Sequence, residues 1–479
     1  MIEAFKKWLS AYNIRYPRSI AYMLQASEYD IHEYASWLRS VKDFSAVEKR
    51  KRFEPTAKGI AMLIIGWLIV FASIGKASFL LWWISGNVKY LLAAAIVIAL
   101  PYIVSYGIII PLIVIKAVQV PIEAIIIAQA KKIIKRHPAV KIGIAGSFGK
   151  TTMREILKAV LSEGKKVAAS PKNYNTPLGI SQFVKSLKGD EEILIFELGE
   201  YYPGDIKRLC ELTLPDIGII TGVNEAHLQK FGTIEKTKAT IFEIADYLGD
   251  KPLFVNGEND YAREELRPGH ILYSRRQVGG WNIRNGESNL TGTAFTMEKE
   301  GKKIELKSSL LGLHQIGPLA AAARIAMDLG LSAEEIRQGI GKTRPFDHRM
   351  EPKPGADGVI TLDDSYNGNP DGVAAVIEFL ASLEDKRRIY VTPGLVEMGS
   401  KKEEVHKRIG QRLAEAGIEK VILTRNSVTP YIEAGLKEKN YKGDIEWFPD
   451  ALAAFAALPY LTVKGDVVLL QNDWPDQYR

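Results

Sequence analysis

The stretch Val140-Lys-Ile-Gly-Ile-Ala-Gly-Ser-Phe-Gly-Lys-Thr-Thr152 decides the fold of most of this chain. Its first part, Val140 to Ala145, is a short apolar run typical of a buried parallel strand. Gly146 and Gly149 then make a turn, and a helical pattern follows from Thr152 to Leu161. A glycine-rich turn between a strand and a helix points backbone N–H groups at a bound phosphate, helped by the helix dipole. The sequence therefore predicts a P-loop-like nucleotide site.

The turn is shorter than the common G-x-x-x-x-G-K-[ST], because Ile144 stands at the first glycine position. In the phosphate-binding interpretation the lysine reaches the β- and γ-phosphates of ATP, and the threonine hydroxyl after it binds Mg²⁺. The residues of this turn that we expect to contact ATP are Gly146, Ser147, Gly149, Lys150, Thr151 and Thr152. The alternative is an ordinary glycine-rich turn with a solvated lysine.

The length, charge and cysteine content of the chain limit its number of domains and its classes of partner. The chain has 479 residues, enough for two or three domains, and a formal net charge of +7. Its basic residues cluster beside apolar segments, which favours a membrane surface over nucleic acid as a partner. One cysteine, Cys210, excludes an internal disulfide and a cysteine-rich metal site, and it is interpreted as a core residue.

The N-terminal part predicts a membrane anchor. Residues 1–56 are amphipathic and rich in aromatic side chains, which indicates short helices at a bilayer interface. Residues 57–118 contain two apolar runs, Gly59–Ile84 and Tyr90–Ile115, each long enough to cross a hydrocarbon core of about 30 Å. Basic residues flank both ends of the pair. We therefore expect a transmembrane helical hairpin at the inner membrane with cytoplasmic catalytic domains. The alternative is a pair of buried core helices.

From Gln119 the pattern changes to that of an α/β protein. An amphipathic helix over Gln119–Arg136 leads into alternating strand and helix patterns, which favour a doubly wound parallel sheet. Trp281–Leu306 breaks this rhythm and predicts a small β-meander beside the sheet. We place a central ATP-binding domain at residues 119–343 and a second, Rossmann-like α/β domain at residues 344–479. The Pro- and Gly-rich segment Pro352–Gly358 is predicted to be a surface turn.

Polar side chains follow several of the predicted strands. Glu197 ends one strand, and the next runs into Thr221-Gly-Val-Asn-Glu-Ala-His227. Ligands of open α/β sheets bind at the carboxyl ends of the strands, so Glu197 and His227 are candidate Mg²⁺ ligands beside Thr151. The alternative for His227 is an ordinary hydrogen-bonded histidine, because Mg²⁺ prefers oxygen ligands.

The second α/β domain carries two further candidate segments. Arg349 follows the predicted hinge, where a guanidinium can reach a transferring phosphoryl group. The run Asp363-Asp-Ser-Tyr-Asn-Gly-Asn-Pro370 ends a strand, and its acidic and amide groups, Asn367 among them, suit contacts to ribose and base. A capped turn between strand and helix is equally compatible with that run.

Taken together, these motifs resemble the Mur ligase superfamily. The segments that carry the resemblance are Gly146-Ser-Phe-Gly-Lys-Thr-Thr152, Asn224-Glu-Ala-His227 with Phe231-Gly232, Phe346-Asp-His-Arg349, Asp363-Asp-Ser-Tyr-Asn-Gly-Asn-Pro370 and Pro393-Gly-Leu-Val-Glu-Met-Gly399. Within the superfamily they are most similar to the MurF ligases, which add D-alanyl-D-alanine to a UDP-linked muramyl peptide. The resemblance runs from about Val140 to the C-terminus.

The resemblance implies an ATP-dependent ligase of cell-wall (peptidoglycan) precursor synthesis. ATP would phosphorylate a substrate carboxylate, and an amine would attack the acyl phosphate to give an amide. The carboxylate would belong to a UDP- or lipid-linked muramyl peptide and the amine to an amino acid or dipeptide, with wall-synthesis proteins as further partners. The residues to which the resemblance gives catalytic, metal or nucleotide-closing roles are Lys150, Thr151, Glu197, His227, Arg349 and Asp364.

The chain also departs from the family pattern. Ile241 occupies the position of the family's carbamylated lysine, and Lys238, one turn earlier, is a conceivable substitute. The family's adenine-side H-N-x-x-N is here His314-Gln-Ile-Gly-Pro318, in which Gln315 can still offer an amide to adenine. The first third of the chain does not resemble MurF, whose UDP-sugar domain is missing.

Two other interpretations remain open at this point. A poly-γ-glutamate-type ligase would keep the chemistry and change the polymer. A degenerate ATP-binding scaffold of a wall-synthesis complex would explain Ile241 and the missing asparagines, although the intact phosphate turn counts against it.

Overall fold

The computed structural model describes residues 2–48, 52–171, 173–225, 228–355, 357–365 and 368–472. Two compact units make up the chain, one of Met1–Ala124 with Pro475–Arg479 and one of Ile125–Trp474. Each unit has its own apolar core.

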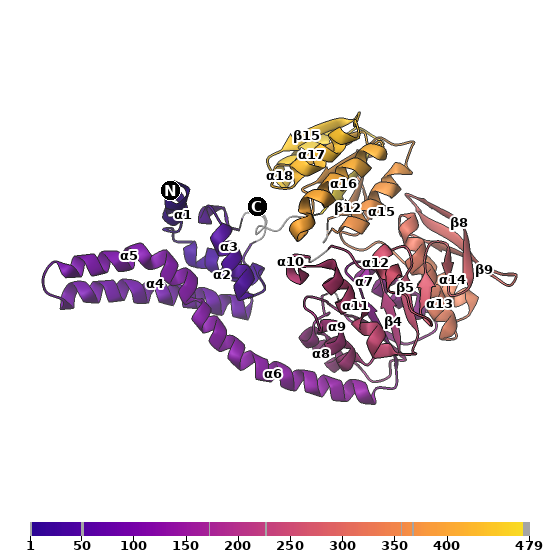
Figure 1. Ribbon diagram of the computed structural model, residues 1–479, viewed down its shortest axis with the longest axis horizontal. Helices are drawn as coiled ribbons and strands as arrows, with labels where there is room; N and C mark the ends of the chain where they lie inside the picture. Colours follow the sequence, from indigo (N-terminus) through magenta and orange to yellow (C-terminus); the bar gives the residue numbers. More distant parts are fainter. Residues whose placement is uncertain are drawn as a thin grey trace. The chain divides into compact units, whose positions relative to one another are not determined.

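The N-terminal unit is helical. Its elements are α1 (Ile2–Ser10), α2 (Tyr16–Ala26), α3 (Ile31–Ser40), η1 (Phe44–Ala46), α4 (Ala57–Trp83), α5 (Val88–Gly107) and the first part of α6 (Ile109–Arg136). Helices α4 and α5 lie side by side as a long hairpin (Figure 1). The aromatic residues of α2 and α3 pack against α4 and α5 in one buried cluster, so they form a core rather than a polar face.

A proline explains why these aromatic side chains are where they are. Pro101 lies inside α5, and a proline has no N–H to give to the carbonyl four residues earlier. That carbonyl belongs to Val97, and the Tyr12 hydroxyl donates to it at 2.7 Å. Farther along the helix, the Tyr34 hydroxyl donates to the Ser105 carbonyl at 2.8 Å. The N-terminal helices therefore supply hydrogen bonds to α5 as well as apolar contacts.

The predicted helical hairpin is present, with one change of boundary. Helix α5 ends at Gly107, and α6 starts at Ile109 instead of near Gln119, because Pro111 falls in the first turn of α6, where a missing N–H costs nothing. By length and composition, Ala57–Trp83 and Val88–Arg136 are apolar enough to cross a membrane, with 22% and 28% of their most apolar windows buried. Core helices of soluble proteins also pass that criterion.

The second unit is built on a ten-stranded sheet in the order β10-β9-β8-β7-β6-β5-β4-β1-β3-β2. The strands from β6 to β2 in this order are parallel, as the alternating pattern predicts. Their bounds are β1 (Val140–Ala145), β2 (Val167–Ala169), β3 (Ile193–Glu197), β4 (Ile217–Ile220), β5 (Leu253–Asn256) and β6 (Ile271–Tyr273). Strands β3, β1 and β4 are neighbours, so their carboxyl ends meet at one edge.

Helices cover both faces of this sheet (Figure 1). They are α7 (Lys150–Leu161), α8 (Pro177–Lys185), α9 (Asp205–Thr213), α10 (Leu228–Phe231), α11 (Ile234–Leu248), α12 (Asp260–Glu264), η2 (Leu313–Gln315), α13 (Ile316–Asp328) and α14 (Ala333–Lys342). Cys210 is fully buried on one face, as predicted.

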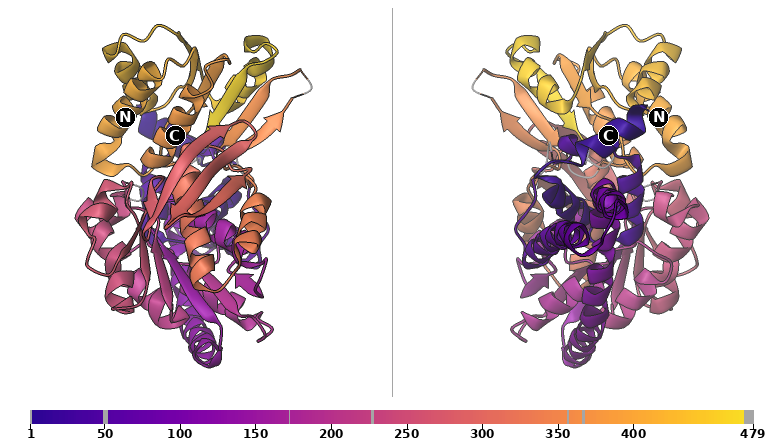
Figure 2. Two further views of the ribbon diagram at one scale, coloured as in Figure 1. Left: turned by 90° about the vertical axis from the view of Figure 1, so that its right-hand side faces the viewer. Right: turned by 90° about the vertical axis from the view of Figure 1, so that its left-hand side faces the viewer.

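The predicted meander is part of the same sheet rather than an insertion beside it. Strand β7 (Gln277–Val278) turns antiparallel to β6, and β8 (Trp281–Asn289), β9 (Gly292–Lys299) and β10 (Lys302–Ser308) continue in that sense. The left view of Figure 2 shows these strands, coloured salmon, as a twisted extension.

A second sheet of order β11-β12-β16-β13-β14-β15 follows. Its elements are β11 (Glu351–Pro354), β12 (Ile360–Asp364), α15 (Pro370–Ala381), β13 (Arg388–Thr392), η3 (Gly399–Lys401), α16 (Lys402–Glu415), β14 (Lys420–Thr424), α17 (Thr429–Glu438), β15 (Asp444–Phe448), α18 (Ala451–Leu461) and β16 (Val467–Gln471). The surface turn predicted for Pro352–Gly358 is wrong at its start, because Pro352 and Pro354 lie in β11. Prolines are tolerated there because β11 is an edge strand.

The Tyr34 hydroxyl gives a test of the N-terminal core. Replacing Tyr34, which is fully buried, by Phe leaves the Ser105 carbonyl without this donor. We expect a loss of about 1–3 kcal/mol in the free energy of unfolding, measured by urea denaturation. Tyr90→Phe, at a 59% exposed tyrosine of α5, is the matched control and should change little. Equal stability of the two variants would contradict this account.

Candidate functional site

The turn after β1 has the backbone that a phosphate loop needs. Gly149 has φ +74° and is the residue before α7, so the helix begins directly at Lys150. Gly146 has φ +140°, and a Cβ placed on it would lie 2.2 Å from the Thr221 Oγ1. Neither position accepts a side chain without strain. The turn is thus held tightly against the end of β4.

Hydrogen bonds fix this contact. The Thr221 hydroxyl donates to the carbonyl of Ala145 at 3.2 Å and also to that of Phe148. In return the Ser147 N–H donates to the Gly222 carbonyl at 2.9 Å. Ser147 Oγ is buried, and within the described ranges it has no hydrogen-bond partner. A buried hydroxyl of this kind at the start of a helix is suited to an oxygen of a bound anion.

A hydroxyl and a carboxylate meet beside the turn. Thr151, in the first turn of α7, donates from Oγ1 to the Glu197 carboxylate at 2.9 Å. Glu197 is the last residue of β3 and is 6% exposed. Arg154 Nη1 donates to the same carboxylate at 3.0 Å and neutralises its charge. The oxygens of Thr151 and Glu197 are hard ligands of the type that Mg²⁺ prefers, so this pair fits the predicted metal.

Glu200 is a site residue that the sequence interpretation missed. Its carboxylate accepts from Lys150 Nζ at 3.0 and 2.9 Å, and Lys150 also donates to the Gly146 carbonyl. The Glu200 side chain is 1% exposed. Its position in the sequence was an available signal, because it stands three residues beyond Glu197 at the carboxyl end of the same strand.

The C-terminal domain contributes a second polar group, at the end of β12. Asp363 accepts from Lys353 Nζ at 2.7 Å and lies 2.9 Å from His348 Nδ1. Arg349 stands between two residues with left-handed backbone, His348 at φ +62° and Met350 at φ +47°. A chain forced through two such conformations holds Arg349 in a defined direction.

Asp364 is the most perturbed carboxyl of this group. It is 7% exposed and accepts from the Met350 N–H at 3.3 Å. Burial raises the pKa of Asp364 from 3.8 to about 7, although the nearby Arg349 charge opposes the shift. The structure therefore brings Arg349 and Asp364 together, while their predicted contacts with ATP stay predictions.

Side chains also join the central and C-terminal domains within this unit. Asn224, after β4, donates from Nδ2 to Asn369 Oδ1 at 3.0 Å and to Asp371 Oδ2 at 2.8 Å. Farther away, Arg275 pairs with Glu378 at 2.8 Å. Segments of both domains that carry candidate residues are thereby tied to each other.

Gln315 and Lys238, the suggested substitutes for the family's adenine-side amide and carbamylated lysine, both have other partners in the structure. Gln315 Nε2 is 2.8 Å from Nε2 of His314, whose pKa burial lowers to about 4. Lys238 pairs with Glu264 at 2.9 Å and Glu265 at 3.1 Å, which raises its pKa. Carbamylation requires a neutral amine, so this pairing opposes the suggested role of Lys238. Ile241 is fully buried in the apolar core.

His227 and Asn367 lie outside the described residues. Their predicted roles stay predictions. Among the residues that are described, no group of three or more His, Cys, Asp or Glu side chains could hold a metal ion. Glu197 and Thr151 alone represent the predicted metal ligands in that part of the chain.

Comparison with protein families gives two matches. Residues 144–326 match the Mur ligase middle domain, and residues 348–471 match the Mur ligase, glutamate ligase domain. Both matches begin near the candidate residues: the first includes the phosphate turn, and the second begins one residue before Arg349. Residues 1–143 precede both matched ranges.

Several curated relatives are named UDP-N-acetylmuramoyl-tripeptide–D-alanyl-D-alanine ligase. The protein of Mycobacterium tuberculosis (strain H37Rv) is 29% identical over 293 residues, which are 59% of this chain and 58% of the relative. For Escherichia coli K12 the identity is 27% over 297 residues, 60% of this chain and 64% of the relative. The chain thus spans about three-fifths of the length of these relatives.

Solved structures agree on the fold. MurF from Acinetobacter baumannii has a TM-score of 0.65 at 20% identity, covering 73% of this chain and 77% of that one. MurF from Thermotoga maritima in complex with ADP has a TM-score of 0.65 at 24% identity, covering 73% and 80%. These likenesses establish the α/β Mur ligase fold for the second unit.

The predicted location at the inner membrane is wrong on these comparisons. The matching curated relatives are named UDP-N-acetylmuramoyl-tripeptide–D-alanyl-D-alanine ligase and the solved structures MurF, and none of these names assigns its protein to a membrane. The two long apolar helices are a feature that a soluble protein can also show. The prediction gave too much weight to length and apolarity, which a buried helix and a membrane span share.

The buried carboxyl of Asp364 predicts a pH-dependent stability. Between pH 3.8 and about 7 the folded protein holds a proton that the unfolded chain has lost, so stability falls as pH rises through this window. Asp364→Asn removes the effect. We expect the stability difference between wild type and variant to change by roughly 1–3 kcal/mol between pH 5 and 8, in urea denaturation. Asp385→Asn, at an exposed carboxylate, is the control. An identical pH profile for wild type and Asp364→Asn would contradict the shift.

Proposed function

We propose that this chain, which belongs to the Mur ligase family, is an ATP-dependent ligase of the MurF type. It joins a D-alanyl-D-alanine dipeptide to the carboxylate of UDP-N-acetylmuramoyl-tripeptide in peptidoglycan synthesis, the reaction for which its relatives are named. The observation that carries the proposal is the meeting of Lys150, Thr151 and Glu197 at the carboxyl ends of neighbouring strands.

ATP and Mg²⁺ are the proposed cofactors, and the phosphate turn supports them. The N–H groups at the start of α7 would face a bound polyphosphate. Thr151 and Glu197 would hold Mg²⁺, with His227 as a further ligand on the family resemblance. When bound, ATP would supply the phosphoryl group that activates the substrate carboxylate as an acyl phosphate, with ADP as the leaving group, and the amine would then displace phosphate to give the amide.

The residues of this chain have distinct tasks in that reaction. Lys150, the cation of the turn, would exchange Glu200 for the β- and γ-phosphates. Arg349 would approach the phosphoryl group from the C-terminal domain, and Asp364 would serve the nucleoside side, with Asn367 and Gln315 as further contacts on the family resemblance. The links from Asn224 to Asn369 and Asp371 keep the two domains closed over the acyl phosphate, which limits its hydrolysis.

A scaffold without catalysis is the second candidate. The buried Ile241 and the paired Lys238 favour it, because isoleucine has no amine to carbamylate and the ion pairs of Lys238 oppose its carbamylation. The complete set of Lys150, Thr151 and Glu197 favours catalysis. A poly-γ-glutamate-type ligase has no observation in its favour beyond the shared chemistry.

Phosphate release decides between these candidates. With ATP, Mg²⁺, UDP-N-acetylmuramoyl-tripeptide and D-alanyl-D-alanine, we expect phosphate to form only when both substrates are present. Lys150→Ala should lower the rate by about a hundredfold or more, because it removes the cation that stabilises the transferred phosphoryl group. Lys158→Ala, at an exposed lysine of the same helix, is the matched control. ATP binding without phosphate release would favour the scaffold.

The Lys150–Glu200 pair gives a separate prediction. Glu200→Gln frees Lys150 and removes a buried negative charge beside the phosphates. We expect Mg·ATP to bind more tightly, by a factor on the order of ten or less, in titration calorimetry. Glu211→Gln, at an exposed glutamate of α9, is the control. Weaker binding by Glu200→Gln would show that Glu200 contributes directly to the ATP site.

A further inference from the structure

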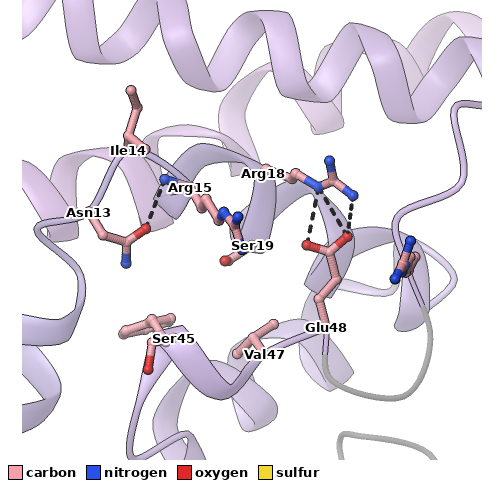
Figure 3. Close-up of a pocket in the computed structure, with 10 residues that line it drawn as sticks. Asn13, Ile14, Arg15, Arg18, Ser19, Ser45, Val47 and Glu48 are labelled. Carbon is pink, nitrogen blue, oxygen red and sulfur yellow. Dashed lines mark hydrogen bonds and ion pairs between the residues drawn. The ribbon is translucent and has the colours of Figure 1, made fainter.

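The N-terminal unit contains a cavity of about 770 Å³ that lies outside both family matches. Figure 3 shows it between the start of α2, the turn before it and the segment that includes η1. Its lining residues are Asn13, Ile14, Arg15, Arg18, Ser19, Phe44, Ser45, Val47, Glu48 and Arg52. We propose that this cavity binds the diphosphate group of an organic ligand.

The charges of the lining favour an anion. The lining holds three guanidinium groups, those of Arg15, Arg18 and Arg52, and one carboxylate, that of Glu48. Glu48 is already occupied: it accepts from Arg18 Nε at 3.0 Å and Nη2 at 2.7 Å, and from the Phe53 N–H at 2.7 Å. Within the described ranges neither Arg15 nor Arg52 has an ion-pair partner. The cavity therefore carries an excess of two positive charges.

The start of α2 adds a second, independent reason. This helix of 11 residues begins after Arg15, which makes no side-chain cap, and its first turn has no acidic residue. Cations at the positive end of a helix dipole are unfavourable by roughly 0.3–1 kcal/mol each. Arg15 and Arg18 both stand there. A bound anion would offset this repulsion.

The size and hydrogen-bonding groups of the cavity define the ligand further. The planar guanidinium group of arginine can donate to two phosphate oxygens at once, and the Ser19 hydroxyl lines the cavity as a further polar group. Arg18 is held in place by Glu48 and lies over the Phe53 ring, so its orientation is set before binding. A volume of 770 Å³ exceeds that of a diphosphate, which leaves space for an attached organic group.

The substrate of the proposed function contains such a group, since UDP joins its sugar through a diphosphate. On that point the inference rests on the proposed function. A prenyl diphosphate carries the same chemistry on an apolar chain. The shared recognition element is the diphosphate, and the probes below separate the two sources.

The test uses the full-length protein and titration calorimetry with UDP, geranyl diphosphate in detergent, and inorganic pyrophosphate. Arg15→Gln/Arg52→Gln removes the two unpaired guanidinium groups without breaking an ion pair. Arg39→Gln/Lys42→Gln makes the same charge change at exposed residues outside the cavity. Circular dichroism and the melting temperature verify that both variants fold.

We expect the cavity variant to bind its preferred probe at least about tenfold more weakly than wild type, and the control variant to differ by less than about twofold. Preference for UDP identifies the nucleotide source, and preference for geranyl diphosphate identifies the prenyl source. Equal binding by the two variants would overturn the proposal, as would binding abolished by Lys150→Ala alone. If the protein has ligase activity but the cavity variant binds every probe as tightly as the control variant, the cavity proposal fails and the proposed function stands.

Discussion

The close approach of the Gly146 turn to the end of β4 is the contact on which the candidate site depends. A Cβ on Gly146 would lie 2.2 Å from the Thr221 hydroxyl, so the turn can pack there only as glycine. The same hydroxyl holds the carbonyls on both sides of the turn. Because β4, β1 and β3 are neighbours, this packing sets the start of α7 beside the end of β3. As a result Lys150 contacts Glu200, and Thr151 contacts Glu197.

Charge balance organises the rest of the site. Lys150 and Arg154 neutralise the two buried carboxylates of Glu200 and Glu197. A buried charge without a partner is costly, so each carboxylate needs its cation until phosphate and metal arrive. The C-terminal domain repeats this pattern with Asp364, whose raised pKa reflects burial that Arg349 offsets only in part. The site is thus assembled from paired groups that can exchange partners when a ligand binds.

Strong periodic patterns made much of the fold predictable. The apolar run before Gly146 and the alternation of strands and helices fixed the parallel part of the first sheet, and the positions of Glu197 and Asp364 at strand ends followed. Strand β11 was missed because its prolines favour a turn. Prolines are tolerated in β11 because it lies at the edge of the sheet and pairs with β12 alone. Glu200 was missed because its role depends on a contact with the Lys150 side chain, 50 residues away in the sequence, and its place just beyond Glu197 was the signal that could have indicated it. The predicted membrane location was wrong for a different reason, because the length of an apolar helix does not by itself distinguish a membrane span from other apolar helices.

The central claim is that this chain activates a substrate carboxylate with ATP at the Lys150 turn. Its most direct test uses a UDP-N-acetylmuramoyl-tripeptide labelled with ¹⁸O in the reacting carboxylate, with mass spectrometry of the phosphate released in the presence of D-alanyl-D-alanine. An acyl phosphate transfers one carboxylate oxygen to phosphate, so this account predicts phosphate that carries one ¹⁸O atom. Phosphate without the label would show that ATP is hydrolysed by water, and would contradict the claim.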